Sequence, residues 1–188
     1  LSAREDFYLS FNVTPDYFVT DAFCDRLMET VRSAGIGPGQ IGIEITERQA
    51  FEDGERAREA VSRLRREGIR VLIDDVGIGH SGLSQIQMLG ADTIKIDKFF
   101  VDSISLDTSS NIVVEMLARL ARDKDMTIIA EGIESEEQAA ALASCGVTSG
   151  QGYLVARPAS WDDFAGAMAD GSLESRLRSI SRRVDEAA

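Results

Sequence analysis

The chain has little of what several classes of protein require. It contains two cysteines and one histidine in 188 residues. Cys24 and Cys145 are far apart, and neither has a histidine or second cysteine at the spacing of a zinc site, so we expect free, reduced thiols. No apolar run approaches the ~20 residues of a membrane span, and no signal peptide is visible. With a net charge of −12 the chain lacks a basic nucleic-acid or membrane-surface footprint, and we expect a cytoplasmic domain.

What the chain does contain is six short apolar stretches that read as buried strands, each followed at once by polar residues. They are residues 7–11 before Asn12, 41–43 before Glu44, 71–73 before Asp74 and Asp75, 93–94 before Lys95, 126–130 before Glu131, and 147–150 before Gln151. The carboxyl ends of parallel strands meet at one face of an α/β barrel, so these polar side chains converge. Clustered acids are costly unless cations hold them, so the pattern predicts a site for hard divalent metals.

Helical patterns separate these strands. We expect helices from Asp21 to before Gly35, over residues 53–66, after Ser81, over 110–123, from the capping box of Ser135 to Gly146, and from Ser160 and Ser172. The expected buried residues are Phe23, Leu27 and Val31 in the first helix, Ala57, Ala60, Val61 and Leu64 in the second, and Ile112, Val113, Met116, Leu117 and Leu120 in the helix over 110–123. The alternation predicts a parallel α/β sheet with right-handed crossovers.

The number of strands bears on the architecture. A closed (β/α) barrel has eight strands and typically ~250 residues, whereas six strands are predicted here. We expect a TIM-like barrel over residues 1–171 whose first two strands are absent from this chain, and a C-terminal amphipathic helix over 172–188 packed on or extending it. An open doubly wound sheet is the alternative, although its polar residues gather at one switch point rather than after every strand.

Six ordered motifs carry a resemblance to a known family. They are Asn12 within residues 11–13, Glu44 to Glu47, Asp74-Asp75-Val76-Gly77, Lys95-Ile96-Asp97, residues 130–134 with Glu131 and Glu134, and Gln151-Gly152-Tyr153. The chain resembles the EAL-domain family of bacterial cyclic-di-GMP phosphodiesterases up to about Ala169. The resemblance implies a modified TIM barrel that hydrolyses this second messenger to linear pGpG with two Mg²⁺ or Mn²⁺ ions.

The resemblance also implies residue roles. Asn12, Glu44 and Asp74 resemble ligands of one metal, with Asp74 bridging to a second metal held by Asp75 and Glu131. Lys95 resembles the residue that contacts the nucleophilic water, and Gln151 the residue that orients this assembly. The remaining matches are Glu47, which resembles a brace of the loop after Asp75, Glu134, the second acid of its motif, and Asp97, which positions Lys95 or touches the substrate.

Two departures limit what the resemblance implies. The metal-binding glutamate of the family's Glu-Ala-Leu motif is not in this chain, and we expect it on one of the absent strands. The loop over residues 76–82 differs from the usual family pattern, which puts metal affinity and regulation in question. His80 stands there in place of an aromatic residue, and we favour a packing or loop role for it over catalysis.

Other function classes remain open. The alternatives are a degenerate cyclic-di-GMP receptor, a signalling or dimerisation module, and an unrelated barrel enzyme such as an aldolase with Lys95 as its Schiff-base residue. We expect a homodimer through the barrel, and upstream sensory domains in the parent protein. Because two strands and one metal ligand are missing, residues 1–188 alone should be weakly active or inactive, with an N-terminal sheet edge that favours association.

Overall fold

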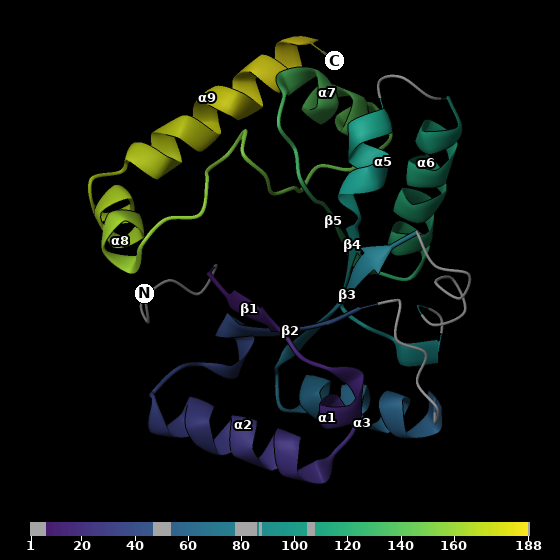
Figure 1. Cartoon of the computed structure of the whole chain (residues 1–188), viewed down its shortest axis with the longest axis vertical. Helices are drawn as coiled ribbons and strands as arrows, with labels where there is room; N and C mark the ends of the chain where they lie inside the picture. The colour runs from purple at the N-terminus through teal and green to yellow at the C-terminus, as the bar shows by residue number, and fades with distance from the viewer. Residues whose placement is uncertain (1–6, 47–53, 78–85, 87, 105–107, 188) are drawn as a thin grey trace. The chain divides into compact units, whose positions relative to one another are not determined.

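The computed structural model describes residues 7–46, 54–77, 86, 88–104 and 108–187 (Figure 1). The strands are β1 (Leu9–Asn12), β2 (Ile41–Thr46), β3 (Arg70–Val76), β4 (Thr93–Ile96) and β5 (Thr127–Ala130), and hydrogen-bonded neighbours follow this order. The chain divides into two compact units. The first is Leu1–Lys95 with Lys124–Thr127, and the second is Ile96–Asp123 with Ile128–Ala188.

In the first unit, β1, β2 and β3 pair in parallel. Helices α1 (Pro15–Phe18), α2 (Asp21–Ser33) and α3 (Gly54–Arg66) pack on one another, and α3 also contacts β3. A short 3-10 helix, η1 (Pro38–Gln40), leads into β2. The core of this unit is formed by β-branched and aliphatic residues, among them Ile43, Ile45, Val71, Ile73 and Leu64, all 1% exposed or less. Such continuous apolar strands are typical of parallel sheets covered by helices.

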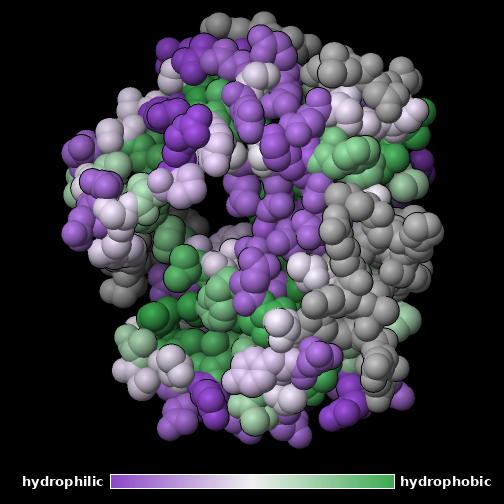
Figure 2. Space-filling view, in the orientation of Figure 1, coloured by the Kyte–Doolittle hydropathy of each residue, from purple (hydrophilic) through white to green (hydrophobic). Residues whose placement is uncertain are grey.

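Gly42 lets the first two strands approach closely. A Cβ at this position would lie 2.9 Å from Leu72 Cδ1 and 3.0 Å from Ser10 Cβ. Because Gly42 has no side chain, Ser10 of β1 and Leu72 of β3 can pack closely against β2, just before the polar residues at the strand ends. Within the described residues β1 pairs only with β2, and its Leu9 and Phe11 are 60% and 38% exposed. Figure 2 shows green, apolar surface over the part of this unit where β1 runs.

The second unit consists mainly of helices. These are α5 (Lys98–Ser103), α6 (Thr108–Asp123), α7 (Glu136–Ser144), α8 (Trp161–Ala169) and α9 (Ser172–Ala187). The α7 and α8 helices begin at the predicted caps Ser135 and Ser160, each of which accepts a backbone N–H, and Ser135 forms the capping box with Gln138. The α9 helix packs against α7 and α8. No helix among the described residues is sufficiently long and apolar to span a membrane.

Three structural predictions need correction. The sixth strand, over residues 147–150, is only a parallel bridge between Ala130 and Gly150, because Val147 alone is buried there and the next three residues are exposed. In α2 the buried residues are Phe23, Cys24, Met28 and Val31, and Leu27 is only half-buried. In α6 the buried apolar residues are Val114, Leu117, Ala118 and Ala121, whereas Ile112 is 60% and Met116 45% exposed.

Other predictions hold. Ala57, Val61 and Leu64 are buried in α3, although Ala60 is half-buried. Both cysteines are free and buried, as expected. Of the short helix expected after Ser81, Ile86 and Leu89 are described and buried, and Leu83 lies outside the described residues.

Candidate functional site

The strand register of the first unit brings polar residues to one face. Asn12 of β1 is the Cα partner of Glu44 in β2, and Thr46 of β2 is the partner of Asp74 in β3. Paired residues of neighbouring parallel strands share a face, and residues two apart in one strand do so as well. Asn12, Glu44 and Asp74 therefore lie on the same face at the carboxyl ends of three adjacent strands.

Lys95 of β4 joins two of these carboxylates in a buried ion group. Its Nζ lies 2.6 Å from Glu44 Oε2 and 3.2 Å from Asp74 Oδ1. All three residues are buried, with exposures of 4% for Lys95, 7% for Glu44 and 8% for Asp74. The Ser10 hydroxyl donates a hydrogen bond to the other oxygen of Glu44. Burial on this scale is rare for charged residues unless they are paired, as they are here.

The charges of this ion group do not cancel. Two carboxylates and one ammonium carry a net charge of −1 in a site that is largely removed from water. Desolvating unbalanced charge is costly, and a divalent cation with oxygen ligands relieves that cost. The donor set of Glu44, Asp74 and the nearby carboxamide of Asn12 therefore fits a hard cation such as Mg²⁺ or Mn²⁺.

Asp75 adopts an unusual backbone conformation next to this group. Its φ is +56°, in the left-handed region, and its N–H donates to Asp74 Oδ1 at 3.0 Å. A non-glycine residue rarely adopts this region, although aspartate tolerates it better than most. Because a left-handed residue breaks the alternation of a strand, the Asp75 side chain is not constrained to the face opposite Asp74. Local strain of this kind is common at functional sites.

In the second unit, Glu131 and Gln151 lie together. Gln151 Nε2 donates to Glu131 Oε1 at 2.8 Å. The backbone holds the two segments side by side, because the Gln151 N–H donates to the Ala130 carbonyl and the Ile133 N–H to the Gln151 carbonyl. A Cβ at Gly152 would lie 2.2 Å from both the nitrogen and the oxygen of Ile133. Only glycine permits this approach, so Gly152 fixes the position of Gln151.

Asp97 and Glu134 make structural contacts in the same unit. The Asp97 carboxylate caps α5 by accepting the Phe99 N–H at 2.7 Å. Glu134 is paired with Lys98, whose Nζ lies 3.0 Å from Glu134 Oε1 and 2.6 Å from Asp102 Oδ1. The hydrogen bonds that its ammonium donates to Asp102 and then Glu134 raise the pKa of Lys98. Glu47 and His80 lie outside the described residues.

Sequence reasoning missed two contributors to these clusters, Ser10 and Lys98. Strand alternation was a signal for Ser10, because it lies two residues before Asn12 and so on the same face. The signal for Lys98 was weaker, since nothing in the local sequence connects it to Glu134, 36 residues later.

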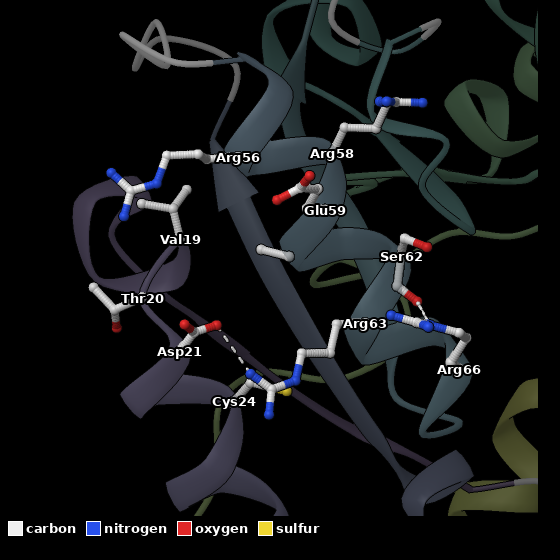
Figure 3. A pocket seen from close by; sticks show the side chains of 11 residues that line it. Val19, Thr20, Asp21, Cys24, Arg56, Arg58, Glu59, Ser62, Arg63 and Arg66 are labelled. Carbon is white, nitrogen blue, oxygen red and sulfur yellow. Dashed lines mark hydrogen bonds and ion pairs between the residues drawn. The ribbon is translucent and has the colours of Figure 1, made fainter.

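The cavity in Figure 3 is separate from these residues. It has a volume of about 480 Å³ and is lined by the start of α2 and by Arg56, Arg58, Arg63 and Arg66 of α3. Arg63 is already paired with Asp21 at 3.1 Å and Asp25 at 2.6 Å. None of the predicted site residues lines this cavity, so it does not mark the candidate site.

The comparisons with known proteins decide the family. The model of the EAL domain matches residues 1–158. The chain belongs to the EAL-domain family. The EAL domain of Mycobacterium smegmatis DcpA superposes with a TM-score of 0.83 at 32% identity, over 87% of this chain and 74% of that one. This confirms the predicted modified barrel over the open doubly wound sheet.

Other EAL relatives have names that indicate function. The chain is 35% identical over 153 residues to PdeN of Escherichia coli, which is named a probable cyclic di-GMP phosphodiesterase. This alignment covers 81% of this chain and 29% of PdeN. Klebsiella pneumoniae BlrP1, solved as calcium and manganese complexes with cy-diGMP, has a TM-score of 0.75 at 32% identity, over 80% of this chain and 39% of BlrP1. The chain spans about a quarter of the length of the curated relatives it matches first.

Proposed function

We propose that this EAL domain hydrolyses cyclic-di-GMP to linear pGpG as a metal-dependent phosphodiesterase. The observation that carries the proposal is the buried group of Glu44, Asp74 and Lys95, with its net charge of −1 at the carboxyl ends of parallel strands. These are positions to which the family resemblance assigns metal binding and catalysis. The names of PdeN and of the BlrP1 complexes support the same substrate and a divalent cation.

The proposed cation ligands are the residues that the family resemblance implies. We propose that Asn12, Glu44 and Asp74 hold one ion, and that Asp74, Asp75 and Glu131 hold a second. Bound ions would polarise a phosphoryl oxygen and lower the pKa of a bound water. All of the proposed donors are oxygens, which is the ligand type that Mg²⁺ and Mn²⁺ prefer.

The chain's own side chains have distinct tasks in this proposal. Lys95 Nζ keeps Glu44 and Asp74 together and limits the charge that the site holds without cations. As an ammonium it also offers a positive charge near the attacking water as an electrostatic partner, whereas a neutral amine at the same position would accept a proton from that water. The Gln151 amide orients the Glu131 carboxylate by occupying one of its oxygens. Hydrolysis forms one P–O bond to water and breaks the bond to the ribose oxygen, so a single phosphodiester is opened.

The test is an assay of purified protein containing this domain. Cyclic-di-GMP is incubated with Mg²⁺, with Mn²⁺, and with EDTA, and the products are separated by ion-pair chromatography. We expect pGpG with either metal and none with EDTA. Binding of intact cyclic-di-GMP without any turnover would replace this proposal by a receptor function. No binding and no turnover would contradict both.

A further inference from the structure

The C-terminal helix α9 reaches two segments that surround the Glu131–Gln151 pair. Arg176 Nη2 donates to the Leu154 carbonyl at 3.1 Å, three residues after Gln151. Arg183 Nε donates to Glu136 Oε1 at 2.5 Å, in the first turn of α7 and five residues after Glu131. The helix lies beyond residues 1–158, the part that matches the EAL model. Its two arginines therefore contact the segments that follow Gln151 and Glu131 in the sequence.

The two arginines act from one face of α9. Arg176, Ile180 and Arg183 are spaced four and three residues apart, which places them in one stripe of a helix. Ile180 is 8% exposed and anchors this stripe. The α9 helix packs against both α7 and α8. The two arginine side chains are exposed, but the helix that carries them is fixed by its packing.

The contact at Leu154 is linked directly to Gln151. The Leu154 N–H donates to the Ile133 carbonyl at 2.9 Å, and the Ile133 N–H donates to the Gln151 carbonyl at 3.0 Å. Gly152 lies against the backbone of Ile133 so closely that no side chain fits. A displacement of Leu154 would therefore move the segment that presents the Gln151 amide to Glu131.

We propose that α9 is a positioning element of the catalytic site, in which Arg176 holds the loop after Gln151 and Arg183 holds the start of α7. This inference rests on the proposed function, because the task of the Glu131–Gln151 pair is taken from it. Arg176 acts through the loop and touches no reacting atom. Release of α9, by a partner or by truncation, would then lower turnover without removing any metal ligand.

The experiment compares arginine variants of the same purified protein containing this domain that the hydrolysis assay uses. Arg176→Ala and Arg183→Ala remove the two contacts, whereas Arg176→Lys keeps a charged donor group at the end of the side chain. Arg178→Ala is the matched control, because Arg178 is exposed on the same helix and neither hydrogen bond involves it. Amide hydrogen exchange at Ile133, Gln151 and Leu154, and at Gln138 in the first turn of α7, is measured first, followed by kcat and KM for cyclic-di-GMP. The exchange measurement does not depend on activity, so failure of the proposed function would be seen separately.

We expect exchange at the first three amides to be at least about ten-fold faster in Arg176→Ala than in the control, as for loss of a hydrogen bond from a charged group. The kcat should fall several-fold with KM nearly unchanged, and Arg176→Lys should recover part of it. Arg183→Ala should accelerate exchange at the first turn of α7. Exchange in Arg176→Ala equal to that in Arg178→Ala would overturn the proposal, and so would faster exchange with an unchanged kcat.

Discussion

At the scale of single residues, Lys95 sets how much negative charge the first unit holds at its strand ends. The residue is 4% exposed, and its ammonium contacts both Glu44 and Asp74. Replacing it by methionine keeps much of the apolar stem but leaves two buried carboxylates without their cation. Removing one partner of a buried pair typically costs about 3–5 kcal/mol. We therefore expect Lys95 to contribute to stability as well as to the proposed chemistry.

Lys95→Met should accordingly lower the unfolding free energy by about 3–5 kcal/mol in metal-free buffer. Addition of Mn²⁺ should restore part of that loss, because a cation at the carboxylates replaces the missing charge. Turnover should fall by ~10²–10⁴, the range for acid–base groups. Urea unfolding with and without Mn²⁺ measures the first effect. Unchanged metal-free stability would show that the ion group does not form.

Asp74→Asn should act in the opposite direction on stability. The carboxamide keeps the shape of the side chain and reduces the net charge of the ion group from −1 to zero, so the fold should survive with an equal or higher Tm. Loss of a cation ligand should reduce turnover about a hundred-fold or more, because such ions contribute several kcal/mol to transition-state stabilisation. Asp16→Asn on the exposed start of α1 is the control. Full turnover by Asp74→Asn would contradict the two-metal proposal.

Cys24 gives a prediction about pH. Burial raises the pKa of its thiol, and the charge of Arg63 opposes that shift. The folded state therefore favours the neutral thiol. Its contribution to stability is complete below the usual thiol pKa and is lost as the pH rises through the folded-state value. Between pH 7 and pH 10, the urea midpoint of the wild type should fall more steeply than that of Cys24→Ala. Parallel slopes would show that this thiol does not titrate.

The residues of the ion group were predictable because each follows an apolar stretch. Glu44, Asp74 and Lys95 end three short runs, and the parallel arrangement alone places such residues at one edge. The sequence could not show that Lys95 pairs with both acids, since that depends on side-chain rotamers and on strand spacing near Gly42. The left-handed backbone of Asp75 was also not predictable, because it depends on the fold rather than on local preference.

At the scale of elements, the helix boundaries followed from caps and glycines, whereas the buried faces did not always follow from apolar spacing. Ser135 and Ser160 begin their helices as predicted because a serine hydroxyl satisfies a free N–H. In α6 the small residues Ala118 and Ala121 are buried and Ile112 is exposed. Alanine allows close packing of helices, so a face that contains alanines can be the buried one. A prediction based on large apolar side chains does not identify such a face.

The loop after Gln151 gives a prediction at this scale. Gly152→Ala places a methyl group within 2.2 Å of the Ile133 backbone, so the loop must move and Gln151 with it. We expect lower Tm and loss of most turnover. Gly166→Ala is a matched control in α8, where a Cβ meets nothing within 4 Å, and it should stabilise by about 0.4–1 kcal/mol. Thermal unfolding and turnover of both variants provide the comparison. Equal behaviour would contradict the tight approach.

At the scale of the whole molecule, the net charge of the chain affects how the proposed substrate can bind. The chain carries a net charge of −12, and cyclic-di-GMP is itself an anion, so attraction must come from local cations. Bound cations would therefore allow a cluster of acids to bind a phosphodiester.

The exposed Leu9 and Phe11 of β1 bear on association of the protein, as does the predicted homodimer. Sedimentation over a range of protein concentrations measures this association.

The central claim is that the buried group of Glu44, Asp74 and Lys95 is part of a divalent metal site, and calorimetric titration with Mn²⁺ tests it most directly. We expect saturable binding by the wild-type protein and by Glu29→Gln, a control on the exposed side of α2. Glu44→Gln should bind at least about ten-fold more weakly while its circular dichroism is unchanged, since loss of a ligand costs more than ~1.4 kcal/mol. Binding by Glu44→Gln as tight as by the wild type, or no binding by the wild type, would contradict the claim.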